Sequence, residues 1–243
     1  MQKINFFCIN LISRSDRWRD CEHQFLLQKL KVHRWNAKPR PENRRFGAWL
    51  SHREIIEHAK KNHWDCVAVF EDDIKFLTND FLEECNLAMN DLKGIDWYIV
   101  YFGGQIWKGW SLISQKWLNK VFLVKKLFEA HAVIYNAKFY DLYLQKHPAE
   151  YTSEIWEYYL DNMYRSFDEW YANCVQERYP CYITKKMFVV QKDDFSNIEN
   201  KNVWRKSRAQ IIFLMYRLHL WWLVESWWKY IKLLMRLCNF YNK

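Results

Sequence analysis

The sequence predicts an α/β fold, with one Rossmann-type domain over residues 1–200 and a helical tail over residues 201–243. Apolar runs of strand length alternate with stretches of helix length in the first hundred residues, which is typical of βαβ units and favours a mainly parallel central sheet. Half of the 243 residues are hydrophobic, enough to build one large core. Composition changes once, near residue 200, and we place the domain boundary there.

The first elements are predicted from apolar runs and from the capping residues and prolines that bound them. Residues 4–11 predict a strand, and Ser15 or Asp16 is a suitable N-cap for a helix over 16–30. Residues 33–46 contain two prolines and five Lys or Arg, and they predict a loop. A helix over 47–62 and a buried strand over 64–70 follow.

Two of the later elements end at glycine residues. Gly94 closes an amphipathic helix over 79–93, and Gly103 and Gly104 close a strand over 96–102. Further strands are expected at 121–124, 130–135 and 182–191, and further helices at 137–146 and 154–176, the last with a break near Phe167.

Positive charge is concentrated in the tail. Residues 201–243 hold nine Lys or Arg and one acid, Glu225, so they carry +8 of the net charge of +9. The body is nearly neutral, and its sequence has no recognisable nucleic-acid motif. We therefore expect no nucleic-acid partner.

The tail has the pattern of an interfacial helix. Glu225, Lys229, Lys232 and Arg236 fall on one helical face, and the remaining positions between 221 and 236 are rich in Trp and Leu. Such a helix favours anionic lipid, so we expect residues 205–243 to bind an anionic membrane surface. The alternative is a helix that docks on its own domain or on a second subunit.

Cysteine usage indicates a reducing compartment. The seven cysteines are odd in number and contain no C-x-x-C pair, which argues against a disulfide framework and against a zinc site. The start of the sequence lacks the pattern of a signal peptide. We expect a cytoplasmic protein held peripherally at the inner face of the membrane.

Three consecutive carboxylates, Glu71, Asp72 and Asp73, follow the apolar strand over 64–70. In an open α/β sheet the ligand crevice lies outside the carboxyl ends of the strands. Alternation along an extended segment places Glu71 and Asp73 on one side, where Mg²⁺ or Mn²⁺ between them would hold a diphosphate. The alternative is a solvated acidic turn.

Residues 46–58 form a second candidate segment. Gly47 permits close approach of a ligand to the backbone, and the amides at a helix start can receive an anion. Ser51 and His52 could face the same crevice as the carboxylates. The alternative is an ordinary helix with a surface histidine.

Seven segments resemble, in the same order, motifs of the family 25 glycosyltransferases, a group of lipopolysaccharide-type sugar transferases that includes the collagen galactosyltransferases. These segments are 9–18, 47–52, 69–74 (which contains E-D-D), 96–103, 131–135, Asp168, and 188–191 with 196–198. The sequence departs from the family pattern at Ala48, where the family has cysteine, and at Asn197, where it has aspartate.

The resemblance implies a GT-A-like fold, a UDP-sugar donor, Mn²⁺ (or Mg²⁺) as cofactor and inversion at the anomeric carbon. It implies transfer of a sugar, most commonly galactose, to a lipid-linked or cell-surface oligosaccharide such as a lipooligosaccharide core. Glu71 and Asp73 would hold the metal. The donor would be bound by Asn10, Arg14, Arg17, Ser51, His52, Asp72, His131 and Gln191.

Inverting transfer needs a carboxylate base that takes the proton of the acceptor hydroxyl. Asp168 is the candidate, and Asp194 and Asp193, near the end of the last predicted strand, are its rivals. The alternative role for Asp168 is to cap a helix over 168–176.

Structural alternatives remain for three of the donor-binding candidates. Arg14 and Arg17 could pair with Asp16 or Asp20 at the start of the helix, and His131 could be a core histidine. Two other functions also remain: a glycosyltransferase-like protein that binds sugar or lipid without catalysis, and a basic nucleic-acid-binding protein. The intact carboxylate triplet argues against the first, and the confinement of charge to the tail argues against the second.

Overall fold

The computed structural model describes residues 3–41, 43–110, 118–147, 149–150, 166–192, 195–196 and 201–202, together with residues 152, 154, 157, 211 and 214. The strands are β1 (Asn5–Leu11), β2 (Val32–Ala37), β3 (Cys66–Glu71), β4 (Ile74–Phe76), β5 (Ile99–Tyr101), β6 (Gln105–Trp110), β7 (Val121–Phe128), β8 (Ala132–Asn136), β9 (Cys181–Thr184), β10 (Val189–Gln191), β11 (Phe195–Ser196) and β12 (Lys201–Asn202). The helices are α1 (Ser15–Leu27), α2 (Arg44–Lys61), α3 (Phe81–Asp91), α4 (Ala137–Lys146), α6 (Phe167–Trp170), the π-helical turn η1 (Tyr171–Val175) and α7 (Gln176–Arg178).

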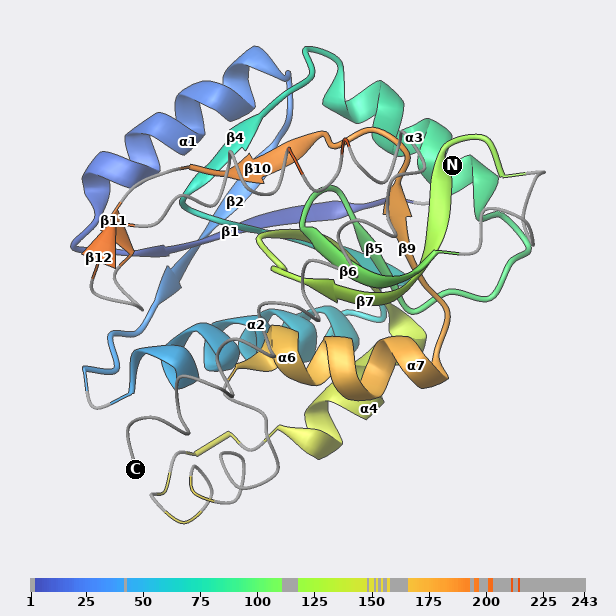
Figure 1. Ribbon diagram of the computed structural model, residues 1–243. Coiled ribbons are helices and arrows are strands. Elements are labelled where there is room, and N and C mark those ends of the chain that lie inside the picture. Colours follow the sequence, from blue (N-terminus) through green and yellow to red (C-terminus); the bar gives the residue numbers. More distant parts are fainter. Residues whose placement is uncertain are drawn as a thin grey trace, which may run out of the picture.

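An eight-stranded sheet in the order β2-β1-β3-β8-β5-β9-β7-β6 forms the centre of the molecule (Figure 1). β1 pairs in parallel with β2 and β3, and β5 pairs in parallel with β9. β8 lies antiparallel between β3 and β5, and β7 lies antiparallel between β9 and β6. The α/β class is confirmed, and the sheet is mixed because β7 and β8 run against the direction that the other described strands of this sheet share.

Alternating side chains of the central strands supply two hydrophobic layers, one on each face of the sheet. Phe6, Cys8 and Phe70 belong to the layer that α1 and α3 cover, whereas Phe7 and Val69 belong to the layer that α2, α4 and α6 cover. Figure 1 shows these helices on opposite sides of the sheet. Because the middles of β1 and β3 are buried on both faces, their sequences are apolar without alternation over 6–9 and 66–70.

The layer under α2 and α4 is rich in aromatic rings. Trp49, Tyr135, Tyr143, Trp170 and Tyr171 are all buried in it. The rings of Tyr135 and Tyr171 lie 6.1 Å apart in an edge-on arrangement, within the range that favours aromatic pairs. Buried tyrosine hydroxyls need hydrogen-bond partners, and this requirement shapes the site described below.

A short antiparallel pair, β4 and β10, lies beside the end of β3. Ile74 pairs with Gln191, and the Lys192 amide donates to the Asp73 carbonyl at 2.7 Å. A Cβ atom at Gly103 would overlap the carbonyl oxygen of Val189, so only glycine lets β10 approach the end of β5 this closely. The close approach brings Gln191 to the acidic segment.

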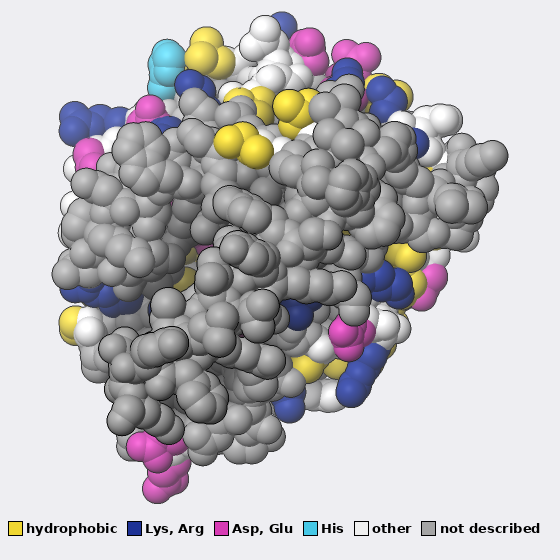
Figure 2. Space-filling view, in the orientation of Figure 1, with side chains coloured by type: hydrophobic (Ala, Val, Ile, Leu, Met, Phe, Trp, Pro, Cys, Tyr) yellow, Lys and Arg dark blue, Asp and Glu magenta, His cyan; other side chains and the backbone are white. Residues whose placement is uncertain are grey.

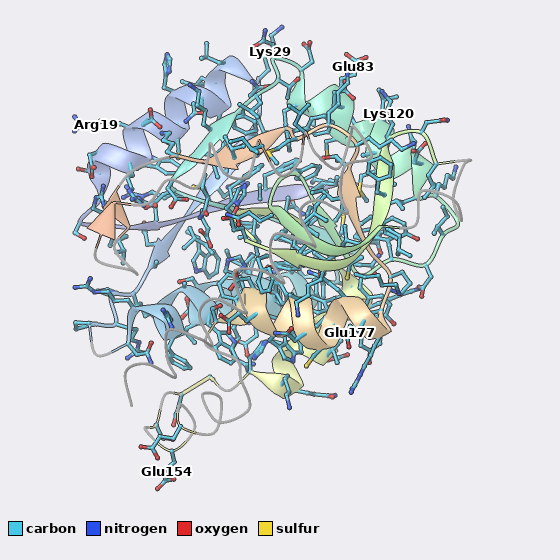
Figure 3. All side chains as sticks on the ribbon, in the orientation of Figure 1. Arg19, Lys29, Glu83, Lys120, Glu154 and Glu177 are labelled. Atoms are coloured by element: carbon cyan, nitrogen blue, oxygen red, sulfur yellow. The ribbon has the colours of Figure 1, made fainter. Side chains whose placement is uncertain are left out.

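Charged side chains project outward from the helices, such as Arg19 on α1, Glu83 on α3 and Glu177 on α7 (Figure 3). Apolar side chains are exposed as well, including Leu26 and Leu27 at the end of α1. Figure 2 shows hydrophobic side chains among charged ones on the side of the molecule where α1 and α3 lie. Among the described residues, no helix combines the length and the apolar character needed to span a bilayer.

Two predicted elements were wrong. Residues 33–46 do not form one loop, because Val32–Ala37 is a strand in parallel register with β1; its polar residues suit the edge of a sheet. Residues 182–191 do not form one strand, because the chain bends at 185–186, where the Lys185 amide donates to the Lys120 carbonyl. β9 therefore stays in the main sheet while β10 pairs with β4.

Four predicted helices are confirmed, and two further predicted segments lie mostly outside the described residues. The helices predicted over 16–30, 47–62, 79–93 and 137–146 are present with small shifts of their ends. Most of the stretch 154–165 lies outside the described residues, as does the tail apart from residues 201, 202, 211 and 214.

Candidate active site

A cavity of about 540 Å³ opens at the carboxyl ends of β1, β2 and β3. These neighbouring strands are parallel, so their ends meet at one edge of the sheet. The cavity is lined by the starts of α1 and α2, by the acidic segment after β3 and by Gln191 on β10. This is the crevice in which open α/β sheets bind ligands, and we call it the first cavity.

Glu71 and Asp73 face the first cavity and meet at the side-chain amide of Gln191. Gln191 Nε2 donates to Glu71 Oε2 at 3.1 Å and to Asp73 Oδ1 at 3.4 Å. The alternation that predicts one common side for Glu71 and Asp73 therefore agrees with where the structure places them. Two carboxylates that share one amide repel each other, so the arrangement favours an added cation.

Asp72, between them, is turned towards β1 and α1. Its Oδ2 atom accepts a hydrogen bond from Asn10 Nδ2 at 2.6 Å, and its Oδ1 atom accepts one from Arg17 Nη1 at 2.8 Å. Asn10 is held in turn by Arg34, whose Nη2 donates to Asn10 Oδ1 at 2.6 Å. Asp72 thus borders the cavity and fixes Asn10 and Arg17 at the end of β1.

The first cavity is also lined by cations. The Lys and Arg residues in its lining are Arg14, Arg17, Lys38, Arg40 and Arg44. Lys38 Nζ lies 3.1 Å from Glu54 Oε1, with the lysine largely exposed. Such a wall would attract an anion, because guanidinium groups bind phosphate oxygens through paired hydrogen bonds.

Arg14 and Arg17 differ in their partners. Arg14 contacts Asp16 through Nε at 3.0 Å and Nη2 at 2.9 Å, and these bonds lower the pKa of Asp16 to about 2. Arg17 pairs with Asp72 and lies 3.8 Å from Asp73 Oδ2. The helix-start ion pair with Asp16 therefore holds for Arg14, whereas Arg17 joins α1 to the acidic segment.

The start of α2 forms a further part of the cavity wall. Asn43 is its N-cap and accepts a hydrogen bond from the Phe46 amide at 3.0 Å. At Gly47 an added Cβ would lie 3.3 Å from the Cβ of Arg40, so glycine keeps the helix close to the cationic loop. Ser51 Oγ donates to the Gly47 carbonyl at 2.9 Å. The positive end of the helix dipole thus adds to the cationic wall.

His52 is part of the lining of the first cavity and is fully buried. Its Nδ1 atom is 2.8 Å from the Tyr135 hydroxyl, and its Nε2 atom is 3.8 Å from Glu71 Oε1. Burial disfavours the charged imidazolium and lowers the pKa of His52 to about 3. The ring is therefore neutral at physiological pH.

A second cavity of about 210 Å³ adjoins the first and shares Ala48, Glu71 and Gln191 with it. Its lining has the opposite charge character, with the carboxylates of Glu129, Asp168 and Glu169 beside that of Glu71 and one cation, Arg45. The first and second cavities therefore meet at Glu71 and Gln191.

Asp168 lies in the first turn of α6 and lines the second cavity. Its Oδ2 atom accepts from the Glu129 amide at 3.2 Å, and the Ser166 hydroxyl donates to Oδ1. The alternative role of Asp168 as a helix cap is wrong, because the N-cap of α6 is Ser166. The Asp168 carboxylate instead bonds α6 to Glu129, the residue that follows β7.

One predicted site residue, His131, stands apart from both cavities. The ring of His131 is buried outside both cavity linings, with Nε2 3.3 Å from the Val189 carbonyl oxygen and Nδ1 4.0 Å from Glu129 Oε2. These contacts are those of a core residue. Asp193 and Asp194 lie outside the described residues.

Sequence reasoning did not single out several residues of the site. Lys38, Arg40 and Arg44 were visible only as basic residues of a predicted loop. Tyr135 belongs to the segment 131–135 that carries the family resemblance, but the pairings of Glu129 with Asp168 and of Tyr135 with His52 were not predicted, because they join residues 39 and 83 positions apart in the sequence.

The carboxylates fit a metal that is shared with a substrate. Within the described part of the chain, no three or more His, Cys, Asp or Glu side chains form a group that could hold a metal ion. Glu71 and Asp73 supply two carboxylates, and Mg²⁺ commonly binds one or two carboxylates while water and substrate phosphates complete its shell. The donor set therefore suits Mg²⁺ or Mn²⁺ only together with a diphosphate.

Comparisons with known proteins give distant structural likenesses. No protein-family model and no curated protein matches the chain. A crystal structure of A197 from STIV is 11% identical with a TM-score of 0.45, over 84% of this chain and 94% of that one. A glycosyltransferase involved in glycosylation of the major capsid of PBCV-1 is 9% identical with a TM-score of 0.45, over 74% of this chain and 80% of that one. At such TM-scores neither structure assigns a family or an activity, so the resemblance to family 25 stays a prediction from the sequence.

Proposed function

We propose that the protein is a metal-dependent, inverting glycosyltransferase that moves a sugar from a UDP-sugar to a hydroxyl group of an oligosaccharide. One observation carries this proposal: a cation-lined cavity at the carboxyl ends of three parallel strands shares Glu71 and Gln191 with a carboxylate-lined cavity. The first cavity would bind a donor with an anionic leaving group, and the second would bind a neutral acceptor that bears hydroxyl groups. Their reacting atoms would meet where the two cavities join.

The first cavity suits a nucleoside diphosphate in size and charge. About 540 Å³ lies within the usual range for small-molecule sites. The cationic wall and the start of α2 would bind the phosphates, and the carboxylates of Glu71 and Asp73 would face them from the other side. Galactose is the sugar that the family resemblance favours.

Glu71 and Asp73 would hold Mn²⁺ or Mg²⁺, which would neutralise charge on the departing diphosphate. The protein's own contribution on this side is positional. Gln191 keeps the two carboxylates together through its amide, and Asp72 fixes Arg17 and Asn10 at the end of β1.

Asp168 is the proposed general base in the second cavity. It would accept the proton of the acceptor hydroxyl as that oxygen bonds to the anomeric carbon and the bond from that carbon to the diphosphate breaks. Attack from the side opposite the leaving group inverts the anomeric configuration. The Glu129 amide and the Ser166 hydroxyl hold the carboxylate in place.

The acceptor and the location follow from the sequence alone. We propose a lipid-linked or cell-surface oligosaccharide, such as a lipooligosaccharide core, reached at the inner face of the membrane. The tail over residues 201–243 carries +8, and its residues 205–243 would bind anionic lipid there. Truncation at residue 204 should abolish binding to anionic vesicles while leaving hydrolysis of a soluble donor intact; unchanged vesicle binding would contradict this placement.

The decisive test is a donor screen. Purified protein is incubated with a panel of nucleotide sugars and Mn²⁺, and nucleotide release is measured with and without oligosaccharide acceptors. We expect release from one UDP-sugar, and stimulation by an acceptor. Binding of UDP without release from any donor under these conditions would indicate a sugar-binding protein that lacks catalysis, and failure to bind any nucleotide would refute the proposal.

A further inference from the structure

His52 has an unsatisfied donor position beside the first cavity. The ring is fully buried, and its Nε2 atom has no hydrogen-bond partner among the described residues, although the residue is part of the lining of the first cavity. The nearest carboxylate oxygen, Glu71 Oε1, is 3.8 Å away, beyond hydrogen-bond length. A buried polar atom left in this state is costly unless a ligand completes it.

The opposite nitrogen is engaged by a chain of tyrosine hydroxyls. The Tyr171 hydroxyl donates to the Tyr135 hydroxyl at 2.9 Å, and the Tyr135 hydroxyl is 2.8 Å from His52 Nδ1. Since the Tyr135 oxygen already accepts from Tyr171, its own proton is directed to Nδ1. With Tyr171 as the donor to Tyr135, Nδ1 is the acceptor of the ring, and the single proton of the neutral imidazole sits on Nε2.

The geometry points to Tyr135 and Tyr171 as positioning residues that hold His52 as an Nε2–H donor towards an oxygen of the bound sugar diphosphate. The identity of the ligand rests on the proposed function; the chain of hydroxyls does not. Tyr171 is the first residue of η1, and such single π-helical turns are frequent at functional sites. Tyr135 lies on β8 and Tyr171 on η1, so the chain of hydroxyls connects a strand and the π-helical turn to His52 on α2.

The first experiment reads the tautomer directly. Protein labelled with ¹⁵N-histidine is examined by NMR at neutral pH without ligand, and His52→Gln assigns the His52 resonances among the eight histidines. We expect a protonated Nε2 and an unprotonated Nδ1. In Tyr135→Phe the Nδ1 acceptor loses its donor, so both tautomers should appear. A wild-type ring protonated at Nδ1 would overturn the inference.

The aromatic layer offers a matched control. Tyr143 is equally buried, and its hydroxyl donates to the Trp49 carbonyl at 3.0 Å, off the chain that leads to His52. Tyr143→Phe should leave the His52 tautomer unchanged. If Tyr135→Phe and Tyr143→Phe give the same spectra for His52 as the wild type, Tyr135 does not position this ring.

The second experiment reads the ligand contact. Binding of UDP-galactose with Mn²⁺ is measured by calorimetry, and we expect Tyr135→Phe to weaken it roughly fivefold, the usual effect of one hydrogen bond. Gln at position 52 can donate from its own Nε2 without any tautomer, so Tyr135→Phe should have no further effect in a His52→Gln background. An equal loss in both backgrounds would overturn the positioning role.

The two experiments separate the possible failures. If wild-type protein shows the expected tautomer but binds neither UDP-galactose nor UDP, the proposed function fails and the contact to a sugar diphosphate fails with it, while the positioning of His52 stands. If wild-type protein binds the donor and Tyr135→Phe changes the tautomer but not the affinity, the contact alone is refuted.

Discussion

The two cavities of this site share Ala48, Glu71 and Gln191, and they differ in volume, in the charge of their lining and in the elements that build them. The first cavity is about 540 Å³ and lined by five Lys or Arg, whereas the second is about 210 Å³ and lined by carboxylates with one cation, Arg45. The first is built by the parallel unit β1-β2-β3 and the starts of the helices that follow. The second is built where antiparallel β7 meets α6.

The difference indicates a division of labour between the two halves of the fold. Parallel strands bring helix starts and basic loops to one edge, where an anion would be bound. The antiparallel half brings acids to the same edge, where a proton can be accepted. Glu71 and Gln191 belong to both chambers, so a change there should affect both functions, whereas other changes should affect only one.

The largest effect is expected in the first cavity beside the shared junction, from Asp73→Ala. Removing one of the two carboxylates joined by Gln191 should lower transfer by at least about 10³-fold, because charge on the leaving diphosphate would no longer be neutralised. The measurement is initial rate at saturating Mn²⁺, with thermal unfolding as a check on the fold. Excess chelator should produce the same loss in the wild type.

Asp96→Ala is the control for that change. Asp96 is exposed and pairs with Lys138 on the surface, so its loss removes the same charge without touching either chamber. Full transfer activity by Asp73→Ala, or by the wild type in chelator, would show that Glu71 and Asp73 serve another purpose.

The second prediction tests the acidic chamber alone. Asp168→Asn should lower kcat by about 10²- to 10⁴-fold with little change in the affinity for donor, because only proton acceptance is lost. Glu169→Gln is the matched control, since it removes a carboxylate of the same cavity from the next position in the sequence. If Asp194→Asn reduces kcat and Asp168→Asn does not, the base lies after β10.

Local pattern was enough to predict β1, β3 and the acidic triplet. Apolar runs define β1 and β3, and the triplet follows directly where β3 ends at Glu71, with Asp72 and Asp73 in a turn. The antiparallel half depends on contacts between distant segments. Gln191 reaches Glu71, 120 residues away, only because Gly103 lets β10 approach β5. A polar edge strand such as β2 carries no apolar run, so its sequence resembles a loop.

The third prediction compares adjacent arginines on opposite sides of the division. Arg44 lines the first cavity and Arg45 lines the second, so Arg44→Gln and Arg45→Gln make the same change of charge one residue apart. Arg44→Gln should weaken UDP binding about tenfold, the usual worth of one charged hydrogen bond, and should reduce its sensitivity to salt. Arg45→Gln should leave UDP affinity unchanged. Equal losses in the two variants would show that the charge division does not select the donor.

The smallest effect is expected at the rim of the first cavity, from Asp16→Asn. Asp16 accepts three hydrogen bonds from the Arg14 guanidinium, so removing its charge should free Arg14 for the diphosphate. We expect UDP binding to tighten about twofold, in keeping with the small contribution of an exposed ion pair. Because Arg14 lowers the pKa of Asp16 to about 2, the carboxylate stays ionised down to about pH 3, and the gain should be the same from pH 5 to pH 8. Glu22→Gln, an equal charge change on the exposed side of α1, controls for net charge. Equal tightening by both variants would mean that overall charge, and not the release of Arg14, governs donor affinity.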